Sequence, residues 1–173
     1  PILAGPEIGV ASTKAFTAQL LSLLLLAAKA GLDRGKMNAD DLTTLMSEIQ
    51  AAPGLMSQAL DRAQDYARVA EKLAESDDVL FLGRGAMFPM ALEAALKLKE
   101  ISYIHAEAYA AGELKHGPIA LIDKTLPVII LAPRDVLFEK TISNMQEVMA
   151  RHGQVTLLTD AEGAKLAGEV QNV

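Results

Sequence analysis

The sequence predicts an α/β fold, a three-layer sandwich in which a parallel sheet is flanked by helices on both faces. From residue 79 onward, short apolar runs of strand length alternate with longer helical runs, and this alternation is typical of such sheets. The 173 residues are 51% hydrophobic and 22% charged, which is enough apolar material for one or two compact units. The preceding residues contain no strand-like run and predict helices.

Composition excludes several classes of protein. The absence of cysteine excludes a disulfide framework, a thiolate nucleophile and a cysteine-ligated zinc site, and it is compatible with a reducing cytoplasm. The net charge of −6, without a basic cluster, argues against nucleic acid as a partner. The histidines and carboxylates do not follow the usual spacings of metal ligands. We therefore expect a cytoplasmic protein that uses no metal.

The N-terminal part is predicted to be a loop followed by helices. Residues 1–14 are broken by glycines and prolines, and Ser12 or Thr13 is placed to cap the next helix. Residues 15–31 are almost continuously apolar, but lysines bound them and polar side chains interrupt them. We therefore expect a buried helix rather than a membrane span or a signal peptide. Further helices are expected over residues 39–51, capped by Asn38, and over residues 55–76, after a break at Pro53 and Gly54.

A strand, a glycine turn and a helix are predicted next. The apolar run 79–82 ends in Gly83-Arg84-Gly85, and strong helix formers occupy residues 91–101. Glycines ahead of a helix leave backbone N–H groups exposed at its N-terminus, where negative charge is favoured. This turn therefore favours the binding of a phosphate group or a carboxylate.

The rest of the chain continues the alternation. Residues 105–118 predict a polar loop that carries His105 and His116 ahead of a glycine and a proline. The other expected elements are a strand at 126–131, a helix at 138–151, a strand at 155–159 and the start of another strand at 169–173.

Three charged residues of the predicted helix 91–101 share one face. Glu93, Lys97 and Glu100 follow i, i+4, i+7 spacing. A plain ion pair on a solvated face, worth about 0.2–0.5 kcal/mol, explains Glu93 and Lys97 equally well from spacing alone. A carboxylate at Glu100, near the helix end, is mildly opposed by the helix dipole, which suggests a use for it.

Both ends of the chain suggest that further segments belong to the protein. The helix at 15–31 has no preceding strand on which to dock, and the chain stops where a strand is expected to begin. An apolar helix of this length needs a cover in water, so another subdomain or subunit is expected to provide one. We expect at least a homodimer.

Four long motifs carry a resemblance to a known family. AGPEIGVASTKAFT at residues 4–17, FLGRG at 81–85, ALEAALKLKEISY at 91–103 and HAEAYAAGELKHGP at 105–118 closely resemble the isomerase region of the glucosamine-6-phosphate synthases, the glutamine–fructose-6-phosphate aminotransferases. The resemblance implies two sugar-isomerase (SIS) subdomains. Residues 1–52 then form the end of the first, 53–76 a connecting helix, and 77–173 an incomplete second subdomain.

The resemblance also implies an activity. In that family, ammonia that a separate glutaminase domain releases from glutamine is added to fructose 6-phosphate, and the product is isomerised to glucosamine 6-phosphate, without a cofactor. Glu100 matches the carboxylate that moves a proton between C1 and C2, and Lys97 matches a polar residue beside the substrate. His116 matches the ring-opening acid/base that reaches the neighbouring subunit's site. Val10, Ser12 and Thr13 match the sugar-contacting stretch, although plain capping remains an alternative for the last two.

Two parts of the family's site have no match here. The main phosphate-binding loop is expected upstream of Pro1, and the lysine that forms the Schiff base is expected beyond Val173, so we expect this chain alone to be inactive. Two alternatives remain open. One is an amino-sugar-phosphate deaminase or isomerase without a glutaminase domain, and the other is a non-catalytic sugar-phosphate sensor, which Glu100 and His116 disfavour.

Overall fold

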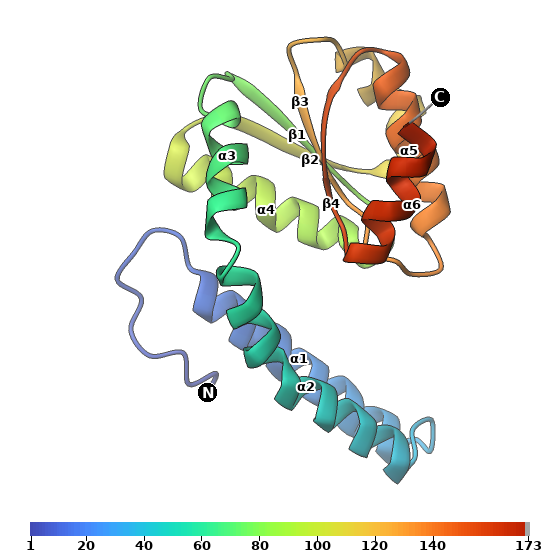
Figure 1. Ribbon diagram of the computed structural model, residues 1–173. Helices are drawn as coiled ribbons and strands as arrows, with labels where there is room; N and C mark the ends of the chain where they lie inside the picture. The colour runs from blue at the N-terminus through green and yellow to red at the C-terminus, as the bar shows by residue number, and fades with distance from the viewer. Residues whose placement is uncertain (172–173) are drawn as a thin grey trace. The chain divides into compact units, whose positions relative to one another are not determined.

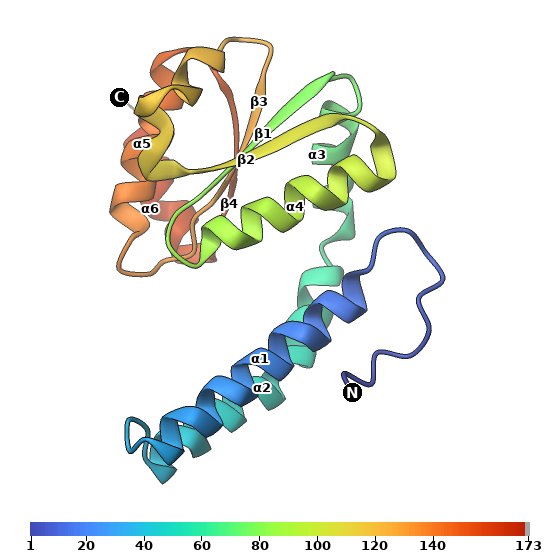
Figure 2. The same ribbon diagram turned by 180° about the vertical axis from the view of Figure 1, so that it is seen from behind.

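The computed structural model describes residues 1–171 and divides into two compact units, Pro1–Ala67 and Arg68–Val173. The N-terminal unit is a loop followed by two antiparallel helices, α1 (Thr13–Asp33) and α2 (Ala39–Leu60), which lie side by side (Figures 1 and 2). Asn38 starts α2 as predicted: its side chain accepts from the backbone N–H of Asp41, whose carboxylate accepts in return from the N–H of Asn38. Ser12 occupies the N-cap position of α1 without a side-chain capping hydrogen bond.

The predicted helix break at Pro53 and Gly54 is wrong. Helix α2 runs through both residues to Leu60, and α3 (Ala63–Leu73) follows instead of one helix over 55–76. Proline removes one i to i−4 hydrogen bond but has the helical φ, so a long helix can continue when neighbouring turns hold it. The assignment of residues 1–52, 53–76 and 77–173 to subdomains stays a prediction.

The leucines of α1 are exposed in the described chain. Leu23 is 62% exposed and Leu26 is 66% exposed, whereas Ala28 is buried. Within residues 1–171, α1 alone is long and apolar enough to cross a membrane by length and composition, a criterion that core helices of soluble proteins also meet. Its hydroxyls at Thr17 and Ser22 donate to carbonyls four residues earlier, which hides part of their polarity.

The second unit contains a parallel sheet, as predicted. Within the described residues it has four strands in the order β2-β1-β3-β4. The strands are β1 (Asp78–Gly83), β2 (His105–Ala110), β3 (Pro127–Leu131) and β4 (Gln154–Leu158). The connecting helices are α4 (Met87–Ser102), the 3₁₀ segments η1 (Ala111–His116) and η2 (Pro118–Leu121), α5 (Phe138–Ala150) and α6 (Ala161–Gln171).

Alternate residues of the central strands face two separate cores, which makes the sandwich three-layered. Val79 and Phe81 of β1 pack with residues of α3 and α4 on one face. Leu80 and Leu82 pack on the other face with α5, α6 and the buried Leu114 of η1. The sequence prediction of an apolar strand buried on both faces is confirmed.

Leu82→Ala should destabilise the protein strongly. Leu82 is completely buried in the middle of the sheet, so truncation removes apolar contacts and leaves a cavity, at a cost of about 2–5 kcal/mol. Urea unfolding measures the loss, with Leu121→Ala as the matched control because Leu121 is exposed. Equal stability of the two variants would contradict the central position of Leu82.

Two sequence predictions for the second unit are wrong. The expected polar loop at 105–118 is strand β2 followed by η1, and its inward-facing residue is the small Ala106, which gave no strand signal. The expected strand at 169–173 is helical up to Gln171, and Asn172 and Val173 lie outside the described residues.

Candidate functional site

Helix α4 brings the predicted charged residues together. Lys97 Nζ lies 2.7 Å from Glu100 Oε2 and 3.5 Å from Glu93 Oε1. Their side chains are between 20% and 25% exposed, so they form a half-buried cluster rather than a fully solvated one. The i, i+4, i+7 spacing is thus confirmed as one contiguous group on the helix.

The hydrogen bond to Glu100 is the main reason that the pKa of Lys97 is raised above its ordinary value. Lys97 therefore stays a cation at neutral pH and cannot serve as an amine nucleophile, which requires a lowered pKa. This fixed cation lies 2.7 Å from Glu100 Oε2. The cluster places two carboxylates and a positive charge side by side.

The raised pKa gives the cluster a defined pH dependence. A folded-state pKa above the ordinary value of 10.5 means that this ion pairing stabilises the fold fully below that pH. The stabilisation is lost as the pH rises through the folded-state pKa. We expect Lys97→Met to lower the urea midpoint at pH 8 and to match the wild type at strongly alkaline pH. A difference that grows with pH would contradict this.

His116 ends η1 and is oriented by a carboxylate that the sequence prediction missed. Its Nδ1 lies 2.7 Å from Glu113 Oε2, and because a carboxylate only accepts, Nδ1 carries the proton and donates it. In this neutral tautomer the other ring nitrogen, Nε2, is the one that can accept a proton. The three-residue spacing of Glu113 and His116 was the available signal.

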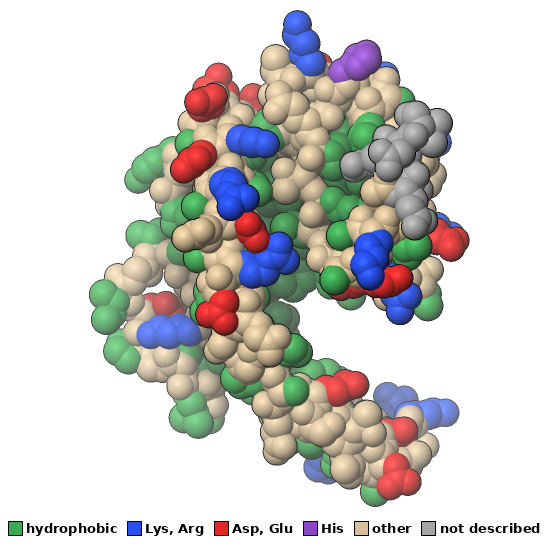
Figure 3. Space-filling view, in the orientation of Figure 1, with side chains coloured by type: hydrophobic (Ala, Val, Ile, Leu, Met, Phe, Trp, Pro, Cys, Tyr) green, Lys and Arg blue, Asp and Glu red, His purple; other side chains and the backbone are tan. Residues whose placement is uncertain are grey.

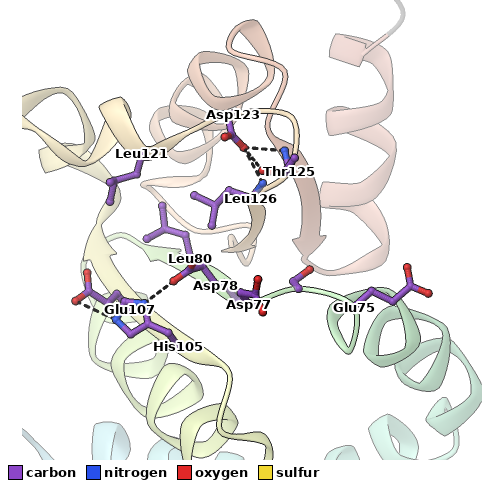
Figure 4. A pocket seen from close by; sticks show the side chains of 12 residues that line it. Glu75, Asp77, Asp78, Leu80, His105, Glu107, Leu121, Asp123, Thr125 and Leu126 are labelled. Atoms are coloured by element: carbon purple, nitrogen blue, oxygen red, sulfur yellow. Dashed lines mark hydrogen bonds and ion pairs between the residues drawn. The ribbon is translucent and has the colours of Figure 1, made fainter.

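His105 takes part in a different arrangement at the opposite, amino ends of the strands. It starts β2, opposite Asp78 at the start of β1, and its Nδ1 lies 2.6 Å from Asp78 Oδ1. Figure 4 shows both beside a cavity of about 390 Å³. Asp123 lines the same cavity and accepts hydrogen bonds from the backbone N–H groups of Thr125 and Leu126. In open parallel sheets, ligands bind at the carboxyl ends of strands, so we assign this cavity no role.

The remaining predicted contacts lie in the N-terminal unit. Ser12 and Thr13 begin α1, and Val10 lies in the preceding loop with its side chain 76% exposed. These residues stand at a helix N-terminus, where backbone donors are available to a ligand.

Glu100 and His116 belong to different layers of the sandwich. Helix α4 packs through Ala91 and Ala95 on one face of the sheet, and η1 packs through Leu114 on the other. In Figure 2 the gold η1 segment runs beside α5, whereas α4 covers the opposite face. Each residue is therefore presented at a different surface of the same unit.

The surface carries no large field of one sign on the face that is visible in Figure 3. Acidic and basic side chains intermingle there, and blue and red atoms alternate along the second unit. Among residues 1–171, no group of three or more His, Asp or Glu side chains is arranged to hold a metal ion.

Comparison with known proteins gives concordant matches. The SIS domain family model matches residues 72–173. The chain is 62% identical over 167 residues to a glutamine–fructose-6-phosphate aminotransferase (isomerizing) from Bradyrhizobium diazoefficiens, covering 96% of this chain and 28% of that protein. The C-terminal domain of glucosamine-fructose-6-phosphate aminotransferase from Francisella tularensis is 43% identical, with a TM-score of 0.90 over 93% of this chain and 45% of that chain.

A more distant solved structure has a different activity in its name. The glucosamine-6-phosphate deaminase from Thermotoga maritima is 29% identical, with a TM-score of 0.65 over 91% of this chain and 45% of that chain. The chain spans 27–28% of the length of the first curated relatives that it matches.

Proposed function

The chain belongs to the SIS domain family, and from this membership we propose that it is the isomerase part of an enzyme that converts fructose 6-phosphate and ammonia to glucosamine 6-phosphate. The observation that carries the proposal is the 62% identity to a glutamine–fructose-6-phosphate aminotransferase over nearly the whole chain. The half-buried cluster of Glu93, Lys97 and Glu100 supports it, because the isomerisation needs a positioned base.

We assign the proton transfer to Glu100. Ammonia first replaces the C2 oxygen of the open sugar, with loss of water, to give an imine. The carboxylate then takes a proton from C1 and the imine nitrogen gains one, so that an enolamine forms. The same carboxyl returns its proton to C2 while the C1 hydroxyl gives up its proton, which leaves an aldehyde at C1 and an amine at C2. Lys97 balances the charge of the carboxylate before transfer. Val10, Ser12 and Thr13 contact the sugar in this proposal.

His116 opens the sugar ring. Nε2 exchanges a proton with the ring oxygen or the anomeric hydroxyl, while Glu113 accepts the hydrogen bond from Nδ1–H and so sets the tautomer of the ring. Because His116 and Glu100 are presented on different layers, we propose that the His116 of one protomer completes the site of a second copy. The protein is then a homodimer at least, acts in the cytoplasm, and receives ammonia from a glutaminase domain of the same full-length chain.

The test is an assay of the full-length protein with fructose 6-phosphate and glutamine. Formation of glucosamine 6-phosphate, with one glutamate released for each product, is the expected result. Light scattering of the same sample should give a dimer or a larger assembly. A stable monomer with full activity would contradict the shared site.

The deaminase named among the related structures defines the competing outcome. Such an enzyme releases ammonia from glucosamine 6-phosphate and does not use glutamine. The identity to the aminotransferase, 62%, far exceeds the 29% to the deaminase, and it favours synthesis. Ammonia release from glucosamine 6-phosphate, without any glutamine-dependent synthesis, would contradict the proposal.

A further inference from the structure

The glycine turn after β1 holds an arginine in a fixed position. A Cβ on Gly83 would lie 2.1 Å from the backbone oxygen of Met87, so the turn is tight, and Gly85 has a positive φ of 57°. Arg84 stands between these two glycines at the carboxyl end of the central strand. The backbone on both sides therefore fixes where its side chain starts.

The guanidinium of Arg84 reaches two other elements. Its Nη1 donates to Asn144 Oδ1 at 3.0 Å, and Asn144 is 8% exposed on α5. A Cβ built on Gly112 of η1 would lie 3.2–3.4 Å from three guanidinium atoms, so the group rests directly against the η1 backbone. Arg84 thus joins β1, α5 and the segment that ends in His116.

A second connection ties the same segment to the same helix. Asn144 Nδ2 lies 3.4 Å from Glu147 Oε2, and Glu147 Oε1 lies 2.9 Å from Nζ of Lys115, the residue before His116. Lys115 is 65% exposed, and an exposed ion pair of this kind contributes little by itself. The half-buried hydrogen bond between Arg84 and Asn144 is the stronger of the two connections.

We propose that Arg84 and Asn144 are positioning residues for the isomerisation: together they fix η1, and through it the orientation of His116. This inference rests on the proposed function. Neither residue needs to touch the substrate in this scheme, because each acts through His116. A displacement of about 1 Å of a reacting group can cost about 10²-fold in rate, which sets the size of the expected effect.

The first test is kinetic and uses the full-length enzyme. Arg84→Met and Asn144→Leu should each lower kcat by about 10- to 100-fold, while KM for fructose 6-phosphate changes less than about twofold because substrate contacts are untouched. Inhibition by glucitol 6-phosphate, which has no ring to open, should be unchanged. The kcat of the double variant should be no lower than the kcat of the slower single variant, since the effects of residues that act as a unit are not additive.

Two further variants calibrate the test. Lys140→Gln, on the exposed side of α5, removes a charge from the same helix and should keep wild-type kcat. Arg84→Lys keeps a cation for Asn144 but loses the planar group against Gly112, and its kcat should fall between those of the wild type and Arg84→Met. If Arg84→Met does not fold, a wild-type kcat in Arg84→Lys overturns the proposal. Losses that multiply in the double variant, or Arg84→Met as active as Lys140→Gln, overturn it as well.

A measurement that does not depend on activity separates this proposal from the proposed function. Hydrogen–deuterium exchange of the full-length protein should be faster over residues 111–117 in Arg84→Met than in wild type, and unchanged over α4. An inactive wild-type enzyme would contradict the proposed function alone. Unchanged exchange over residues 111–117 would contradict the positioning role, whatever the activity.

Discussion

Glu100→Gln is expected to reduce glucosamine 6-phosphate formation by the full-length enzyme by about 10²–10⁴-fold, the usual contribution of a positioned base. Glutamine keeps the size and one hydrogen-bonding oxygen of the carboxylate, so the contact with Lys97 survives in part. What disappears is the ability to take a proton from C1 and return it to C2. KM for fructose 6-phosphate should change little.

The measurement that isolates the role of Glu100 is exchange of the C1 proton with solvent deuterium. Wild type should exchange it, because a carboxylate shared between two carbons can lose the proton to water, and Glu100→Gln should not. Glu75→Gln is the control, since it neutralises a carboxylate near the amino ends of the strands, beside the cavity. Exchange at wild-type rate in Glu100→Gln would contradict the assignment.

The sequence predicted the parts of the fold that depend on local pattern. The apolar runs that became β1 and β3 were recognised because strands buried on both faces are continuously hydrophobic. Strand β2 was missed because it lies at the sheet edge and alternates alanine with polar residues, which gives a weak signal. Helix α2 passed through Pro53 because proline has the helical φ and a helix of 22 residues can lose one backbone hydrogen bond.

The candidate site was predictable to the same extent. The cluster of Glu93, Lys97 and Glu100 follows from helix periodicity alone, and its contacts confirm that pattern. The contact between Arg84 and Asn144 joins residues that are 60 positions apart, so no local sequence pattern predicts it. The opposite placement of α4 and η1 likewise depends on strand order, because β1 and β2 are neighbours whose connecting segments leave on different faces.

That placement leads to the second large effect, in mixed dimers. His116→Ala should lower kcat by about 10²-fold or more, because it removes the proposed ring-opening acid/base. If each site takes Glu100 from one protomer and His116 from its partner, a dimer of one Glu100→Gln chain and one His116→Ala chain has one intact site and one doubly altered site. Random mixing of equal amounts should therefore recover about a quarter of wild-type activity, from two nearly inactive proteins.

The alternative arrangement gives a different number, which makes the experiment decisive. If Glu100 and His116 of the same chain formed one site, every site in the mixture would contain one substituted residue, and mixing would restore no activity. Tagging each chain differently and purifying the mixed dimer should raise the recovery to about half of wild type, because every molecule then has one intact site.

Mixing Glu100→Gln with Lys97→Met is the control: both residues lie on α4, within 2.7 Å of each other, so no exchange of partners can rebuild an intact cluster. Recovery in the first mixture but not in the control is the result that a site shared across the dimer requires.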